Sequence, residues 1–191
     1  MPYNKSGQIS LDELSDEQNA LLNRLAYGDI VDGWGIKIDG KPKTLLEVLP
    51  EDLPLAAEIE AAGLGDLVIK DYENNNGKSG SGFCAVAFED PYTGDVGMSY
   101  RGTEGLEPLE KDNPSLKEII AAITGEDMLD NGATMLVGLS PQVPEALEFY
   151  QKNTNEDGSN HLYGHSKGGE VATEVYVLNY EDIAGIHIIN A

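Results

Sequence analysis

One stretch near the end of the chain constrains the fold more than any other: His-Leu-Tyr-Gly-His-Ser-Lys-Gly-Gly-Glu-Val-Ala at positions 161–172. A short apolar run comes first, the pentapeptide Gly-His-Ser-Lys-Gly follows, and the remaining residues favour a helix. A G-x-S-x-G pentapeptide between a strand and a helix is typical of a nucleophile elbow, in which a strained turn makes a serine hydroxyl protrude. We therefore predict a strand, a sharp turn and a helix, with Ser166 at the turn.

The residues around Ser166 suit such a turn. Gly164 and Gly168 stand two positions before and after it, where strand and helix cross closely and a side chain would obstruct the crossing. Gly169 leaves further room. The amide of Lys167 begins the predicted helix and is expected to point where an oxyanion would form. Because Gly and Ser are common, an ordinary surface turn is the alternative interpretation.

Composition excludes several classes of function. The chain has 191 residues, of which 40% are hydrophobic, as expected for one domain. Its 34 acidic and 12 basic residues give a formal net charge of −22, which argues against binding to nucleic acid or to anionic membranes. No stretch reaches the ~20 apolar residues of a membrane span, and the polar start is not a signal peptide. We expect a cytoplasmic protein, or one secreted without a cleaved signal peptide.

The remaining composition gives no sign of a metal or a cofactor. The single cysteine, Cys84, lies in an apolar run and is expected to be a buried, unreactive thiol. The Asn-rich segment 73–82 could in principle offer oxygen ligands to a cation, but its Gly and Ser content favours a solvated loop. We expect no bound metal and no cofactor.

Alternation of strands and helices predicts the fold class. Residues 1–14 are expected to form a flexible lead-in and residues 15–191 one domain. Helices are predicted at 15–27, 50–62, 115–124, 140–152 and 168–180, a helical turn at 44–49, and strands at 36–38, 67–69, 83–89, 96–101 and 185–189, besides the strand before the elbow. Near-continuous apolar strands indicate an α/β fold whose sheet is covered by helices on both faces.

A second motif points to a known family. Arg-Gly-Thr at 101–103 follows a predicted strand and precedes the Gly-His-Ser-Lys-Gly-Gly of 164–169. With both motifs in this order, the sequence resembles the α/β-hydrolases of the class 3 (fungal-type) lipase pattern, especially a bacterial lipase-like branch with the same elbow. The similarity includes Leu-Ser-Asp-Glu at 14–17, Leu-Ala-Tyr-Gly-Asp at 25–29 and Ser-Pro-Gln at 140–142. It implies an α/β-hydrolase (lipase-like) sheet flanked by helices.

The resemblance implies roles for five residues. Ser166 matches the nucleophile of the family. Thr103 matches an oxyanion-hole residue that donates through its amide and its hydroxyl, and Lys167 matches the second donor, through its amide alone. Arg101 and Gly102 are expected to hold the Thr103 loop. Losing one such donor typically costs on the order of 3 kcal/mol of transition-state stabilisation.

No residue of the sequence is an evident base for Ser166. In this fold an Asp or Glu and then a His follow the elbow helix, and the family pattern places both beyond Ala191. The ring of His165 should point away from the hydroxyl and pack beneath the turn. His161 stands at the opposite end of the same strand, and His187 is expected to be a buried structural residue. We therefore expect an N-terminal part of a longer hydrolase, incomplete at its C-terminus and weakly active at most by itself.

The leading hypothesis is a serine carboxylic-ester hydrolase, lipase-like or phospholipase-like, that forms an acyl-enzyme and acts on a lipid or another ester. It would be the catalytic module of a larger bacterial protein such as a secreted effector. Segment 125–139, rich in Leu and Met, reads as core packing first and as a lid second. A catalytically inactive interaction module and a peptidase or thioesterase are the alternatives. Partners would be the C-terminal remainder and an inhibitor or chaperone protein, although the acidic surface is explained by solvation alone.

Overall fold

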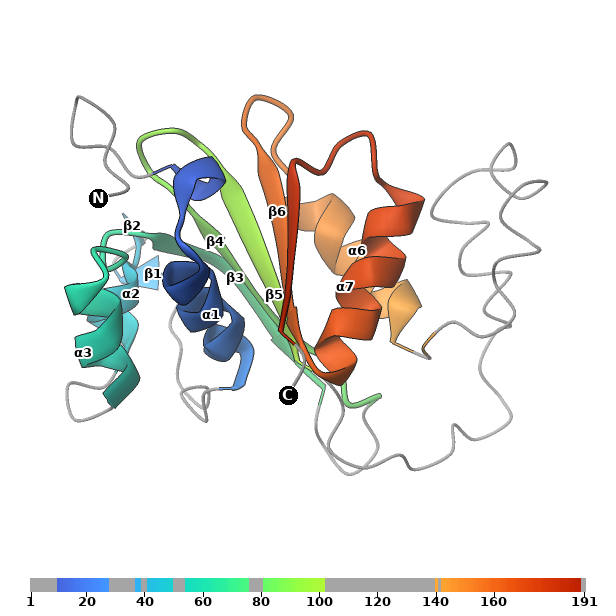
Figure 1. Cartoon of the computed structure of the whole chain (residues 1–191), viewed down its shortest axis with the longest axis horizontal. Coiled ribbons are helices and arrows are strands. Elements are labelled where there is room, and N and C mark those ends of the chain that lie inside the picture. Colours follow the sequence, from blue (N-terminus) through green and yellow to red (C-terminus); the bar gives the residue numbers. More distant parts are fainter. Residues whose placement is uncertain are drawn as a thin grey trace.

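A five-stranded mixed sheet forms the centre of the molecule (Figure 1). The computed structural model describes residues 10–27, 37–38, 41–49, 54–75, 81–101, 140 and 142–189. The strands lie in the order β3 (Val68–Asn74), β4 (Cys84–Glu89), β5 (Val96–Arg101), β6 (Asn160–His165) and β7 (Gly185–Ile189). The β3–β4 and β4–β5 pairs are antiparallel, whereas β5–β6 and β6–β7 are parallel.

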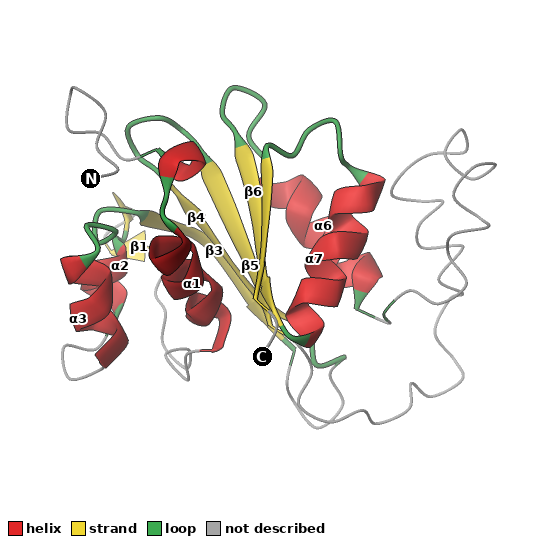
Figure 2. Cartoon of the chain, in the orientation of Figure 1, coloured by secondary structure: helices red, strands yellow, loops and turns green. Residues whose placement is uncertain are grey.

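Helices cover both faces of this sheet, as predicted (Figure 2). One face carries η1 (Leu11–Glu13), α1 (Asp16–Arg24), η2 (Leu25–Tyr27), α2 (Leu45–Val48) and α3 (Pro54–Ala61), and the other carries α6 (Val143–Asn153) and α7 (Lys167–Leu178). A small antiparallel pair, β1 (Lys37–Ile38) and β2 (Lys41–Pro42), lies beside them. The chain therefore has an α/β fold.

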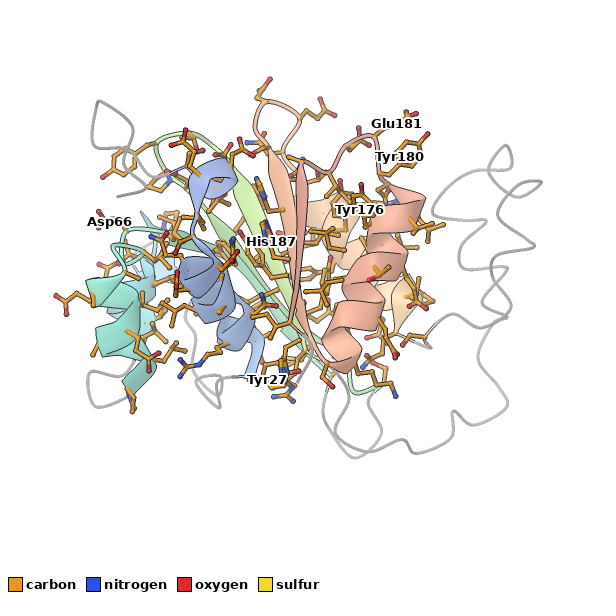
Figure 3. All side chains as sticks on the ribbon, viewed as in Figure 1. Tyr27, Asp66, Tyr176, Tyr180, Glu181 and His187 are labelled. Atoms are coloured by element: carbon orange, nitrogen blue, oxygen red, sulfur yellow. The ribbon has the colours of Figure 1, made fainter. Side chains whose placement is uncertain are left out.

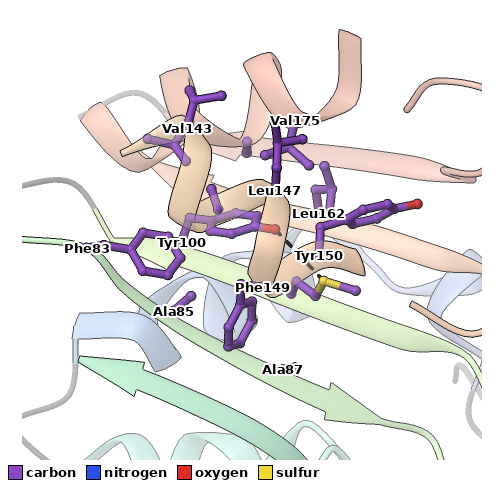
Figure 4. Close-up of a cluster of buried hydrophobic side chains, with 14 of the residues drawn as sticks. Phe83, Ala85, Ala87, Tyr100, Val143, Leu147, Phe149, Tyr150, Leu162 and Val175 are labelled. Carbon is purple, nitrogen blue, oxygen red and sulfur yellow. Dashed lines mark hydrogen bonds between the residues drawn. The ribbon is translucent and has the colours of Figure 1, made fainter. Parts of the chain in front are cut away.

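Each face of the sheet has its own apolar core. The core under α6 and α7, shown in Figure 4, includes Ala85, Ala87, Tyr100, Leu147, Leu162 and Val175. The core under α1, α2 and α3 includes Leu22, Leu25, Ile59, Val86, Phe88 and Tyr163. Successive residues of a strand point to opposite faces, so β4 is apolar at nearly every position because both of its faces are buried.

Local signals place the helix ends where the sequence predicts them. The Ser15 hydroxyl accepts a hydrogen bond from the amide of Gln18, and the Gln18 side chain accepts one from the amide of Ser15, which closes a capping box at α1. Gly63, with φ of 72°, follows α3 in the left-handed conformation that glycine tolerates best. Pro144 lies in the first turn of α6, where its missing N–H costs nothing.

Two expectations need correction. Residues 10–14 were expected in the flexible lead-in, but Leu11 is 1% exposed and packs in the core under α1. Strand β3 runs to Asn74, past the predicted 67–69, so the following loop begins later than predicted. The extra residues, apart from Tyr72, are polar and belong to an edge strand, where pairing with β4 on one side is enough to hold them.

Several predicted features lie outside the described residues. They are the helix at 115–124, the segment 125–139, Gly102 and Thr103. Within the part of the chain that is described, no helix combines the length and the apolar character required to cross a membrane.

Candidate active site

Ser166 occupies a one-residue turn between β6 and α7. The strand ends at His165 and the helix begins at Lys167. The backbone of Ser166 has φ of 54° and ψ of −121°, and among the described residues no other non-glycine residue has a positive φ. These angles belong to the first central position of a type II′ turn, which glycine normally takes. A non-glycine residue persists in such a conformation only where its surroundings enforce it, and this happens chiefly at functional sites.

The strand and the helix cross so closely that an added side chain would collide with backbone at Gly164 and with a neighbouring side chain at Gly169. A β-carbon on Gly164 would lie 2.3 Å from the carbonyl oxygen of Gly168 and 2.7 Å from the Cα of Gly169. A β-carbon on Gly169 would lie 2.7 Å from Cγ2 of Ile188 on β7. The sequence pattern assigned the need for a small residue to Gly164 and Gly168. The structure supports this need at Gly164 and places the second close approach at Gly169, where an added β-carbon would meet Ile188 on β7 and lie 3.4 Å from the carbonyl oxygen of Gly164 on β6.

The hydroxyl of Ser166 is open to approach. Ser166 is exposed, and no described residue forms a hydrogen bond with its side chain. Its backbone N–H donates to the carbonyl oxygen of Ile189 on β7, at 3.0 Å. A turn that holds a serine rigidly by its backbone while leaving its hydroxyl unpartnered is what a nucleophile needs.

The predicted oxyanion side is only partly described. Lys167 provides the first amide of α7, and no described residue accepts a hydrogen bond from it, so this donor at a helix N-terminus is available to an anion. Gly102 and Thr103 lie outside the described residues. Their neighbour Arg101 ends β5, and the parallel register pairs Tyr100 with Gly164. The chain therefore leaves β5 at the same sheet edge as the elbow.

His165 packs beneath the turn, as predicted, and its partner is Tyr27 of η2. Nδ1 of His165 lies 3.0 Å from the Tyr27 hydroxyl, and the two rings meet edge-on at 81°. The same hydroxyl donates to the carbonyl oxygen of His165 at 2.8 Å. Since a hydroxyl has one hydrogen, both contacts are satisfied when Nδ1–H of His165 donates to the Tyr27 oxygen. The ring of His165 is thus engaged away from Ser166.

The other two histidines form a separate cluster, with His161 near the amino end of β6 and His187 in the middle of β7. Nδ1 of His161 lies 3.4 Å from Nε2 of His187, and Nε2 of His161 lies 3.0 Å from a carboxylate oxygen of Asp12. The ring of His187 also stacks on Tyr163, with centroids 4.8 Å apart. Burial lowers the pKa of both histidines, against the opposing effect of nearby carboxylates. Both are therefore neutral near pH 7.

This cluster has a consistent set of proton positions. His187 donates through Nε2 to Nδ1 of His161, and His161 donates through its own Nε2 to Asp12. The prediction that His161 stands at the far end of its strand is confirmed by the β6 bounds. His187 lies midway along β7 (Figure 3) and is half-buried, less buried than predicted, and it contacts His161 and Tyr163. All three histidines of the sequence are thus accounted for, and none is placed as a base for Ser166.

A hollow elsewhere on the molecule does not belong to this site. Its volume is about 750 Å³, and it is lined by Tyr150, Asn155, Asn160, Asn179 and Asp182, among others. These residues lie at the end of α6 and in the loop after it, at the beginning of β6 and around the end of α7, opposite to the elbow. Within the described residues, no group of three or more His, Cys, Asp or Glu side chains is arranged to hold a metal ion.

Sequence reasoning missed the role of Tyr27. The signal was the Leu-Ala-Tyr-Gly-Asp of 25–29, which belongs to the same family resemblance as the elbow but carries no role for its tyrosine. Its partner His165 stands 138 positions away, so no periodicity pairs the two residues.

Comparisons of the sequence with protein-family models and with curated proteins give no match.

Proposed function

We propose that the chain carries the nucleophile of a serine carboxylic-ester hydrolase and that this nucleophile is Ser166. The observation that supports the proposal best is the exposed Ser166 at φ of 54° in a one-residue turn between a buried strand and a helix. An α/β-hydrolase of the class 3 lipase pattern is the proposed family. The parallel β5–β6–β7 half of the sheet, with the turn following its middle strand, supports that assignment.

In the proposed reaction, Oγ of Ser166 attacks the ester carbonyl carbon while its proton passes to a general base. The carbonyl oxygen becomes an oxyanion, which the amide of Lys167 and, by the proposal, Thr103 would stabilise. Collapse of the tetrahedral intermediate breaks the bond to the alcohol, which leaves with the proton. Water then attacks the acyl-enzyme with the help of the same base, and the carboxylic acid is released.

The base is proposed to come from a segment other than β6 and β7. His161 binds both His187 and Asp12, and His165 binds Tyr27. The described contacts of these three histidines leave none facing Ser166, so the base of the proposed triad stays unassigned. A lipid, phospholipid or acylglycerol, is the proposed substrate class. Segment 125–139 lies outside the described residues, and its interpretation as core packing first and as a lid second stays a prediction.

The test compares the whole natural protein with the 191-residue chain. Each is treated with a fluorophosphonate probe and assayed on p-nitrophenyl esters of increasing chain length. We expect labelling at Ser166 and turnover in the whole protein, and loss of both in Ser166→Ala. Ser10→Ala is the matched control, because the Ser10 side chain makes no capping hydrogen bond.

An alternative is a hydrolase-type fold that acts as a catalytically inactive interaction module. The absence of a base for Ser166 among the described residues favours it. A whole protein that folds normally, yet neither reacts with the probe at Ser166 nor turns over any ester, would establish this alternative and refute the proposed hydrolase.

A further inference from the structure

The peptide group that joins His165 to Ser166 is held at both ends. Its carbonyl oxygen accepts the hydrogen bond from the Tyr27 hydroxyl at 2.8 Å, and its N–H donates to the carbonyl oxygen of Ile189 at 3.0 Å. One partner comes from η2 and the other from the end of β7. The orientation of this peptide plane sets φ of Ser166, because φ is the rotation about the bond from its nitrogen to its Cα.

The support behind Tyr27 is rigid. Its neighbours Leu25 and Ala26 are each 1% exposed and belong to the core under α1. The carbonyl of Ala26 accepts a weak hydrogen bond from the Cys84 thiol on β4. Figure 3 places Tyr27 at the sheet end where β7 finishes, which is the end that carries the elbow. The hydroxyl therefore reaches the turn from a fixed part of the fold.

We propose that Tyr27 is a positioning residue for the nucleophile: it holds the His165–Ser166 peptide so that Ser166 keeps its strained conformation. The Tyr27 hydroxyl also contacts Nδ1 of His165, so it holds the His165 ring as well as the peptide. Without the hydroxyl, the peptide keeps only its N–H anchor and can rotate, which relaxes φ and moves Oγ and the Lys167 amide together. A displacement of about 1 Å at a catalytic group can cost on the order of 100-fold in rate.

The first experiment measures catalysis and rests on the proposed function. In the whole natural protein, Tyr27→Phe removes the hydroxyl and keeps the ring. We expect kcat to fall by roughly 10-fold or more with little change in KM, because the substrate surface is untouched while the reacting atoms shift. Tyr92→Phe is the matched control, since Tyr92 is 55% exposed on the β4–β5 loop and far from the elbow. An unchanged kcat in Tyr27→Phe would overturn the proposal.

The second experiment needs no activity. Glycine tolerates the φ of Ser166 and alanine does not, so Ser166→Gly should melt at a higher temperature than Ser166→Ala, by roughly 2–4 °C for each 1 kcal/mol of strain. If Tyr27 maintains the strain, the difference in melting temperature between Ser166→Gly and Ser166→Ala is smaller when each is combined with Tyr27→Phe. An equal difference with and without the Tyr27 hydroxyl refutes the proposal. If the protein is inactive but this difference in melting temperature still shrinks without the Tyr27 hydroxyl, the proposed hydrolase function is refuted and the positioning role of Tyr27 stands.

Discussion

The carbonyl oxygen of Gly168 lies 2.3 Å from the place that a β-carbon on Gly164 would occupy. No non-bonded carbon and oxygen approach so closely, and the obstacle is backbone that cannot rotate away. The crossing of β6 and α7, and with it the orientation of Ser166, thus depends on one missing methyl group.

Substitution of Gly164 and Gly169 should give graded effects. We expect Gly164→Ala to lower the free energy of unfolding by about 1–3 kcal/mol or more, because α7 must shift away from β6. Gly169→Ala should cost less, since its new β-carbon meets Cγ2 of Ile188, a side chain that is 40% exposed and can turn. Thermal or urea unfolding measures both. A loss in Gly164→Ala no larger than that in Gly169→Ala would contradict this expected order.

The His161–His187 pair should make the fold sensitive to mild acid. Burial lowers the pKa of each in the folded state, and Asp12, Asp95 and Asp16 oppose this effect without reversing it. The unfolded chain, with histidine pKa values near 6.5, then binds more protons than the folded chain below that pH. The contribution of the two histidines to the free energy of unfolding is therefore fully present above about pH 6.5. It declines as the pH falls toward their lowered folded-state pKa values, by at most about 1.4 kcal/mol per pH unit for each histidine.

The measurement is the free energy of unfolding between pH 7.5 and 5.5, a window above the ordinary range of carboxylates. We expect His187→Gln to have a flatter dependence than the unchanged chain, because it removes one titrating group and leaves His161 with an amide as its neighbour. The same slope in both proteins would mean that the pair does not titrate differently on folding.

We expect Asp71 to contribute more to the free energy of unfolding than Lys152, which pairs with it. Burial alone would raise the pKa of Asp71, but hydrogen bonds from Lys152 and Asn153 outweigh it and the pKa lies below its ordinary value. Asn153 is 2% exposed, and its amide nitrogen donates to Asp71 at 3.1 Å. Asp71→Ala leaves that buried N–H without this acceptor, which we expect to cost about 1–3 kcal/mol.

Lys152→Ala is the comparison for Asp71→Ala. The Lys152 side chain is 69% exposed, so losing its 2.7 Å ion pair with Asp71 should change the free energy of unfolding by at most about 0.5–1 kcal/mol. Urea unfolding of the two variants decides the order. A larger loss in Lys152→Ala would show that the ion pair, and not the buried amide, joins α6 to β3.

Cys84 should resist thiol reagents in the folded protein. Its thiol is buried, burial raises its pKa, and it donates to the carbonyl of Ala26. We expect labelling only through unfolding, at a rate that rises with urea concentration. Glu156→Cys combined with Cys84→Ala supplies the control, because position 156 is exposed and should react at once. Rapid labelling of Cys84 in native buffer would contradict this expectation.

Much of the fold could be predicted from local patterns. A few consecutive residues are enough to predict each of three features: the capping box of Ser15, the hairpin from β4 to β5 and the strand–turn–helix at Ser166. Strand β3 was predicted too short, because residues 70–74, apart from Tyr72, are polar and only pairing with β4 makes them a strand. The packing of Leu11 was missed for a similar reason, since the core that buries it also draws on distant elements such as β4 and β6.

The sequence by itself determined that Ser166 stands in a tight turn with an exposed hydroxyl. The small residues on both sides of Ser166 and the start of a helix after it shape the turn through contacts between near neighbours in the chain. Such local steric effects do not depend on the rest of the fold. Only the tertiary structure decided that the Tyr27 hydroxyl holds the peptide before Ser166, and that His161 turns to His187 instead of to the nucleophile. Those contacts join residues 138 and 26 positions apart, and their geometry is set by which helix covers which face of the sheet.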